Sequence, residues 1–128
     1  MATRSAAKAQ MRKDNRDRRP KAIAKYIRIS PSKVQIVLDL IRGQDYKDAV
    51  AILKTTAKAA ADPVLKCMNS AAANAEVNLG MNKDALYVAE CFADQGPTLK
   101  RMQPVSRGRG YRILKRTSHI TVILDERA

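Results

Sequence analysis

Hydrophobic residues recur along this chain with two periods, which together predict three strands and three helices. Alternating apolar positions mark three segments, residues 22–29, 85–94 and 118–124, and such alternation is typical of strands that bury one face. The alternating apolar residues are Ile23, Ile27 and Ile29 in the first segment, Leu86, Val88 and Phe92 in the second, and Ile120, Val122 and Leu124 in the third. The last two strands bracket residues 97–118, which predicts a hairpin between them.

Helical spacing of apolar residues appears in three other segments. Ser30 is a favourable N-cap and Pro31 fits a first helical position, so a helix is predicted from there to Gly43, which suits a left-handed C-terminal cap. A second helix is predicted over residues 47–56, after Asp45. A third ends near residue 78 and starts either near residue 57 or at Asp62. The predicted core residues are Val34, Val37, Leu38 and Ile41, then Ala49, Val50, Ile52 and Leu53, then Val64, Leu65, Met68, Ala72, Ala75 and Leu79.

Length and composition fit one small domain with an aliphatic core. The 128 residues include one Phe, four Tyr and no Trp, so Ala, Val, Ile, Leu and Met must fill the interior. Cys67 and Cys91 have no partner spacing and are interpreted as buried thiols of a reducing compartment. No apolar run approaches the ~20 residues that span a bilayer, and the N-terminus lacks the apolar segment of a secretory signal. We therefore expect a cytoplasmic protein without a membrane partner.

Positive charge is concentrated in two segments. The net charge is +13, of which residues 1–21 carry +6 and residues 98–118 carry +7, whereas residues 22–97 are nearly neutral. Concentrated cations call for a polyanion, and nucleic acid is the most common one. Residues 1–21 lack hydrophobic periodicity, so we expect a basic tail that is disordered when free. Its candidate RNA anchors, chosen on charge alone, are Arg12, Lys13, Arg16, Arg18 and Arg19.

The second basic segment is the predicted hairpin, at about residues 97–118. Pro104 should interrupt its ladder, and Gly108 and Gly110 permit a tight or left-handed turn at the tip. Its cations are Lys100, Arg101, Arg107, Arg109, Arg112, Lys115 and Arg116, with no acid among them. They should lie on both faces of a ribbon that is marginal alone, so we expect phosphates on more than one side, as in folded RNA.

Catalytic and metal-binding motifs are not apparent in the sequence. His119 is the single histidine and lacks a paired nucleophile or acid, so we interpret it as a structural or RNA-contacting residue. The two cysteines with this histidine do not form a zinc motif, and Gly108-Arg109-Gly110 does not open a dinucleotide site. We expect no enzyme, no metal and no cofactor. A free-standing nucleic-acid chaperone remains the alternative to a protein with one folded RNA target.

Three motifs resemble a known family. They are IRISPSKVQIVLDLIRG at residues 27–43, SAAANAE at residues 70–76, and SRGRG followed by ILKRTSHITV between residues 96 and 124. In this order they resemble ribosomal protein twenty-two of the large subunit, over about residues 22–125. The resemblance implies one α+β domain over residues 22–128, in which three helices pack on a three-stranded antiparallel sheet and a long β-hairpin protrudes.

The resemblance also implies a role in the large ribosomal subunit. The hairpin would contact large-subunit rRNA and line the exit tunnel, and the protein would support subunit assembly beside neighbouring ribosomal proteins, without forming a homo-oligomer. The tip facing the nascent polypeptide would comprise Arg101, Met102, Gln103, Pro104, Val105, Ser106, Arg107, Gly108 and Arg109. The RNA contacts carried over to the body are Ser30, Lys33, Arg42 and Asn74. The chain departs from the family at Val105, where a basic residue is usual, and in its longer tail.

Overall fold

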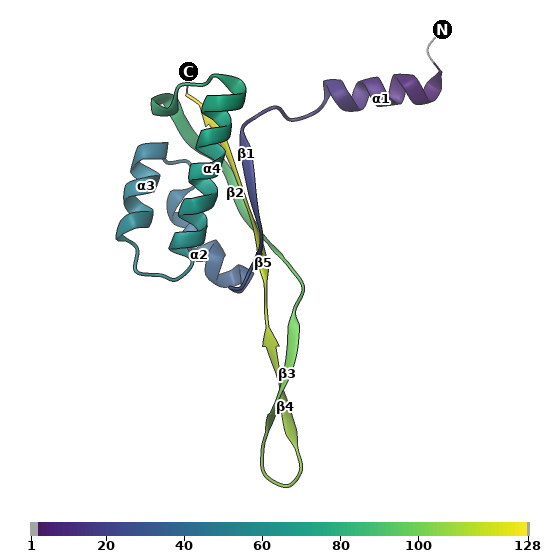
Figure 1. Ribbon diagram of the computed structural model, residues 1–128, viewed down its shortest axis with the longest axis vertical. Coiled ribbons are helices and arrows are strands. Elements are labelled where there is room, and N and C mark those ends of the chain that lie inside the picture. Colours follow the sequence, from purple (N-terminus) through teal and green to yellow (C-terminus); the bar gives the residue numbers. More distant parts are fainter. Residues whose placement is uncertain (1–2, 128) are drawn as a thin grey trace.

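The computed structural model describes residues 3–127, which form a helix-and-sheet body, a projecting hairpin and an N-terminal helix (Figure 1). The helices are α1 (Arg4–Asp14), α2 (Pro31–Ile41), α3 (Tyr46–Thr55) and α4 (Ala61–Leu79), with a short 3-10 helix, η1 (Lys83–Ala85). The strands are β1 (Lys21–Ile27), β2 (Leu86–Gln95), β3 (Leu99–Pro104), β4 (Gly110–Lys115) and β5 (Ser118–Glu126).

An antiparallel sheet with the strand order β1-β5-β2 forms one layer of the body. Ile23 pairs with Thr121, and Thr121 pairs in turn with Phe92, so one row of side chains crosses all three strands. Helix α4 packs over β1 and β5, α2 packs over β2, and α3 lies against α4. The second sheet consists of β3 and β4 alone and extends β2 and β5 away from the body (Figure 1).

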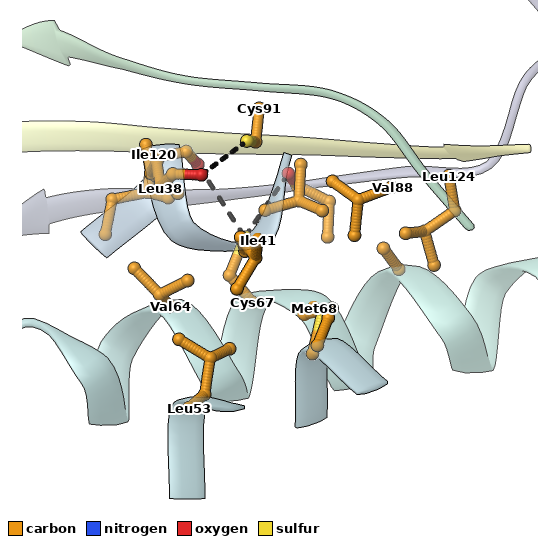
Figure 2. Packing of buried hydrophobic residues seen from close by; sticks show 14 of the residues in the cluster. Leu38, Ile41, Leu53, Val64, Cys67, Met68, Val88, Cys91, Ile120 and Leu124 are labelled. Atoms are coloured by element: carbon orange, nitrogen blue, oxygen red, sulfur yellow. Dashed lines mark hydrogen bonds between the residues drawn. The ribbon is translucent and has the colours of Figure 1, made fainter. Parts of the chain in front are cut away.

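The core between sheet and helices is aliphatic, as the composition predicts. Leu38, Met68 and Ile120 are fully buried and come from α2, α4 and the central strand (Figure 2). The thiol of Cys67 donates to the carbonyl of Ala22 at 3.4 Å. Figure 2 also shows the thiol of Cys91, which donates to the carbonyl of Leu38 at 3.5 Å. Burial raises the pKa of both thiols, so they act as small core residues rather than as reactive groups.

The α+β class and the three body helices are confirmed, but the expected total of three helices is wrong. Helix α1 lies in the tail, where no hydrophobic period predicted it, and none of its residues is buried. Its sequence is rich in Ala, Lys, Arg and Gln, which favour helix intrinsically, and Thr3 caps it by accepting from the N–H of Ala6. An 11-residue helix without burial is marginal in water, so disorder of the free tail stays a prediction.

Two predicted inner faces are wrong, each for a local reason. A register shift between Val88 and Glu90 forms a β-bulge in β2, which turns Cys91 inward and leaves Phe92 exposed. In β1 the alternation correctly predicts a strand, yet Ala22 faces the helices and Ile23 faces outward. The small alanine side allows α4 to approach the sheet closely.

Element boundaries differ from the prediction by a few residues. β1 ends at Ile27, two residues earlier than predicted, and a register shift interrupts its pairing between Ala24 and Ile27. Helix α4 starts at Ala61, which selects the later of the two predicted starts and places Pro63 in the first turn. Its last residue, Leu79, is exposed instead of buried. Gly43 and Gly80 adopt positive φ after α2 and α4, as expected for helix ends.

Two leucines of α2 provide a matched test of this core. Leu38 is 0% exposed and Leu40 is 47% exposed. We expect Leu38→Ala to lower the free energy of unfolding by about 2–5 kcal/mol, because it leaves a cavity under β2. Leu40→Ala removes the same atoms from the surface and should lower it by less than about 1 kcal/mol. Urea unfolding followed by circular dichroism measures both, and equal losses would contradict this packing.

Candidate nucleic-acid interface

The projecting hairpin is a two-stranded ribbon that touches little of the body. β3 pairs with β4 from Leu99 opposite Lys115 to Pro104 opposite Gly110. Every residue of β3 is exposed, and Ile113 is the one half-buried residue of β4. We call residues 97–118 the arm. Because neither of its faces packs on the core, its side chains are available to a partner on both sides.

The register confirms that cations lie on both faces of the arm. Leu99 faces Lys115 and Arg101 faces Ile113 on one side of the ribbon, since direct partners and alternate residues share a face. On the other side Lys100 faces Leu114 and Met102 faces Arg112. Each of these four cross-strand pairs therefore joins one cation to one apolar side chain. Like charges never stand directly opposite each other in these pairs, which reduces repulsion within the ribbon.

A tight turn presents Arg107 and Arg109 at the tip of the arm. The expected interruption of the ladder at Pro104 is wrong, because Pro104 pairs with Gly110 as the last pair before the turn. The N–H of Val105 donates to the carbonyl of Arg109 at 2.9 Å. Gly108 has φ of 68°, which confirms the expected left-handed glycine, and Arg107 has φ of 60°. A left-handed arginine is unusual and was not predicted. It exposes the guanidinium beyond the end of the ladder.

At its root the arm meets the start of α2 in a groove of about 550 Å³. This root groove brings Ser30 and Lys33 from the body together with Lys115 and Arg116 from the arm. The sequence pattern does not connect these two pairs of residues, because more than 80 residues separate them. Arg28, which was not predicted, also lines the groove and donates to the carbonyl of Lys115 at 3.5 Å and to the hydroxyl of Thr117. These acceptors are neutral, so Arg28 keeps its positive charge for an anion.

A second cationic groove, of about 580 Å³, lies between the tail and the end of α4. Its lining includes Lys13, Arg16, Arg18, Arg19, Lys21 and Asn74. Asn74 also donates to the carbonyl of Lys21 at 3.0 Å and so fixes the start of β1. Arg12 does not line this tail groove, although it is exposed on α1. The arrangement supports the tail as an anion-binding segment, which charge alone had indicated.

Arg19 and Arg42, two of the predicted RNA contacts, already have carboxylate partners. Arg19 Nη2 lies 2.8 Å from Asp17 and 2.8 Å from Glu90, and these hydrogen bonds raise the pKa of Arg19. Arg42 Nη1 lies 2.6 Å from Asp39, which raises the pKa of Arg42. Each charge is at least partly neutralised within the protein. We therefore expect both arginines to attract phosphate less strongly than the unpaired cations of the arm do.

His119 lies where the arm joins the sheet, and its contacts are structural. Its Nδ1 accepts from the N–H of Tyr26 at 3.0 Å, and the two rings meet edge to face with centroids 4.9 Å apart. A Cβ added at Gly96 would lie 3.2 Å from the imidazole, so any larger residue there would push the ring away from its present position. Contact of the half-buried His119 with RNA stays a prediction.

Across residues 3–127, no group of three or more His, Cys, Asp and Glu side chains is placed to hold a metal ion. No helix within that range is long and apolar enough to cross a membrane.

Comparison with known proteins decides the family. The sequence model of the family "Ribosomal protein L22p/L17e" matches residues 22–125, which include the body helices, the whole arm and all but the last residue of β5. This chain belongs to that family. The match confirms the resemblance carried by the three motifs, and it begins within β1, so the tail and α1 lie outside it.

Individual bacterial members are also similar over most of the chain. It is 56% identical to large ribosomal subunit protein uL22 of Clostridium novyi over 108 residues, which cover 84% of this chain and 97% of that protein. It is 59% identical to the uL22 protein of Acetivibrio thermocellus, over 84% of this chain and 86% of that one. The uL22 protein of Desulfitobacterium hafniense is 58% identical, with coverage of 84% and 94%.

The Asp17–Arg19 pair makes a prediction about acid pH. Hydrogen bonds from Arg19 lower the pKa of the Asp17 carboxyl to about 2, compared with about 3.9 in an unfolded chain. The pair's contribution to the free energy of unfolding is therefore fully present above about pH 4. It is lost as the pH falls through 2, where the Asp17 carboxyl takes up a proton. NMR titration of the Asp17 carboxyl carbon should give this low pKa, and Arg19→Gln should return it toward about 3.9. An unchanged pKa in the variant would mean that Arg19 is not its partner.

Proposed function

We propose that this protein is a structural constituent of the large ribosomal subunit, where it binds rRNA through its arm and its basic tail. One observation carries the proposal: the arm carries seven cations and no acid, on both faces of its ribbon, at its tip and at its root, and all but one of its strand residues are exposed. A surface of this kind suits phosphates that approach from several sides. A straight duplex would contact one face and leave the other unpaired.

Arginine gives the arm contacts that lysine alone would not supply. Five of its seven cations are arginines, whose planar guanidinium pairs with phosphate in a fork and stacks on unpaired bases. The intervening apolar side chains, such as Met102 and Tyr111, offer surfaces for exposed bases and sugars. Phosphate contacts would supply most of the affinity, and the irregular shape of folded RNA would determine the site.

The root groove supports a defined exit angle for the arm. Anionic RNA seated there would be held by Lys33 of the body and by Lys115 and Arg116 of the arm at the same time. Such a bridge would reduce the freedom of the arm relative to the sheet. RNA binding would therefore also order the protein, in keeping with a role in subunit assembly.

The family resemblance supports a position of the arm along the wall of the nascent-peptide exit tunnel. In this proposal its tip, residues 101–109, lies near the growing polypeptide, and the body sits toward the tunnel mouth among other large-subunit proteins. The exposed turn with Arg107 and Arg109 supports a cationic surface at that point. Val105 is half-buried there. Because it stands where the resembled family usually has a basic residue, the tip carries one cation fewer.

Sedimentation tests the proposal against a free nucleic-acid chaperone. We expect the tagged full chain to remain with large subunits in sucrose gradients at a salt concentration that strips loosely bound proteins, because its contacts are internal to folded rRNA. Recovery at the top of the gradient, together with equal binding to any duplex, would instead support the chaperone.

Replacement of three tip-side arginines should weaken RNA binding without loosening the body. We expect Arg107→Ala, Arg109→Ala and Arg112→Ala together to reduce the salt dependence of rRNA-fragment binding, measured as the slope of log K against log salt, by about 2 to 3. The melting temperature should move by less than about 2 °C, because these side chains bury no apolar surface in the core.

The matched control removes three charges from the opposite part of the molecule. Lys47, Lys54 and Lys83 lie on or beside α3, and their replacement by Gln should leave the slope almost unchanged. Equal slopes for both triple variants would mean that the arm attracts RNA only through net charge. An equal loss of melting temperature in the arm variant would show that the arm packs on the body.

A further inference from the structure

The two edge strands of the three-stranded sheet differ in whether their outward backbone groups have hydrogen-bond partners. On the β2 edge the N–H of Gly43 donates to the carbonyl of Val88 at 3.0 Å, and the N–H of Val88 donates to Gln44 at 2.9 Å. Further along, Arg42 Nη2 donates to the carbonyl of Cys91 at 2.9 Å. The backbone groups that β2 turns away from β5 are thus satisfied at these points, which protects this edge from pairing with other strands.

The β1 edge is open near its middle. The N–H of Leu124 donates to the carbonyl of Pro20 at 2.9 Å, and antiparallel alternation then turns the backbone groups of Lys21 and Ile23 away from β5. Asn74 binds the Lys21 carbonyl at 3.0 Å. Among the residues that the structure describes, none pairs with the N–H or the carbonyl of Ile23 on this side. The N–H and the carbonyl of Ile23 are therefore available to pair with another strand.

A groove of about 330 Å³ runs beside this edge, between β1 and α4, which lie next to each other in Figure 1. Its lining includes Ala22, Ile23 and Ala24 from β1 and Pro63, Lys66 and Ser70 from α4. The small side chains leave room for inward-pointing residues of an incoming strand. The side chain of Ile23 is 50% exposed and offers apolar contact on the outer face.

We propose that the β1 edge and this groove bind an extended acidic segment of a partner protein, which adds to the sheet beside β1. Backbone pairing at Ile23 would supply the register, and the groove would accept alternate side chains. Three exposed lysines, Lys21, Lys25 and Lys66, surround the site, and no carboxylate lines it. Acidic side chains in the other alternate positions would pair with these lysines.

Charge and hydrogen-bonding chemistry favour this partner over two others. A second copy of the chain, paired antiparallel about Ile23, would bring Lys21 opposite Lys25 twice, and such like charges on an edge oppose self-association. An RNA phosphate would accept from the Ile23 N–H but would be repelled by its carbonyl, which needs a donor. An acidic peptide strand satisfies both groups and the lysines.

NMR of the isotope-labelled full chain tests the proposal with a synthetic octapeptide of alternating Glu and Val. We expect the peptide to shift the amide signals of Ile23 and Lys25 selectively. Ile23→Pro removes the outward N–H without touching the β1–β5 ladder, so it should weaken binding at least tenfold while the circular dichroism spectrum is preserved. The same octapeptide with a central proline should also bind at least tenfold more weakly.

A charge exchange keeps the test decisive if Ile23→Pro fails to fold. Lys25→Glu with Lys66→Glu should weaken the Glu-Val peptide at least tenfold and create binding of a Lys-Val peptide. The proposal is overturned if neither peptide responds to the exchange. It is also overturned if a single-stranded oligonucleotide moves the Ile23 and Lys25 signals where the acidic peptide does not, or if these signals move with protein concentration alone.

Discussion

The pairing of β5 with strands on both of its sides is the interaction on which the rest of the molecule depends. β5 is buried along most of its length, with Ile120, Val122 and Leu124 under the helices and Thr121 and Ile123 on the other face. The arm continues from this strand and from β2. Its ribbon has no core of its own, so the hydrophobic contacts that hold β5 also fix where the arm begins.

Charge and burial are separated along the chain with little overlap. The body keeps a nearly neutral surface and uses several of its cations in ion pairs, such as Arg42 with Asp39 and Lys47 with Asp84. The arm has no acid with which to do so. The body can therefore fold mainly on apolar contacts and strand pairing, while the arm retains its full electrostatic attraction for RNA.

The sequence predicted the parts of this structure that follow from local rules. Helix α2 was predicted because Ser30, Pro31 and Gly43 mark its ends and its apolar spacing is regular. Phe92 was predicted to face inward, but a β-bulge shifts the alternation of inward and outward side chains in β2 by one residue. The local sequence pattern contains no signal for this bulge. Helix α1 was missed because it rests on intrinsic propensity and capping without burial.

The sequence predicted which charged residues form the candidate interface, but not which of them the fold brings together. The arm's seven cations and their placement on both faces followed from composition and alternation. The root groove could not be predicted, since it joins Lys33 to Lys115 through tertiary folding. The partners of Arg19 were hidden for the same reason, because Glu90 lies on a distant strand.

The alternation of cation and apolar side chain across β3 and β4 makes the arm's length adjustable. Adding one residue to each limb would lengthen the ribbon by roughly 3.3 Å and exchange its two sides. Because both sides carry the same mixture, the exchanged ribbon would meet its surroundings with nearly the same chemistry. Evolution could therefore lengthen or shorten the arm one residue pair at a time without changing the mixture of cationic and apolar side chains on its two faces.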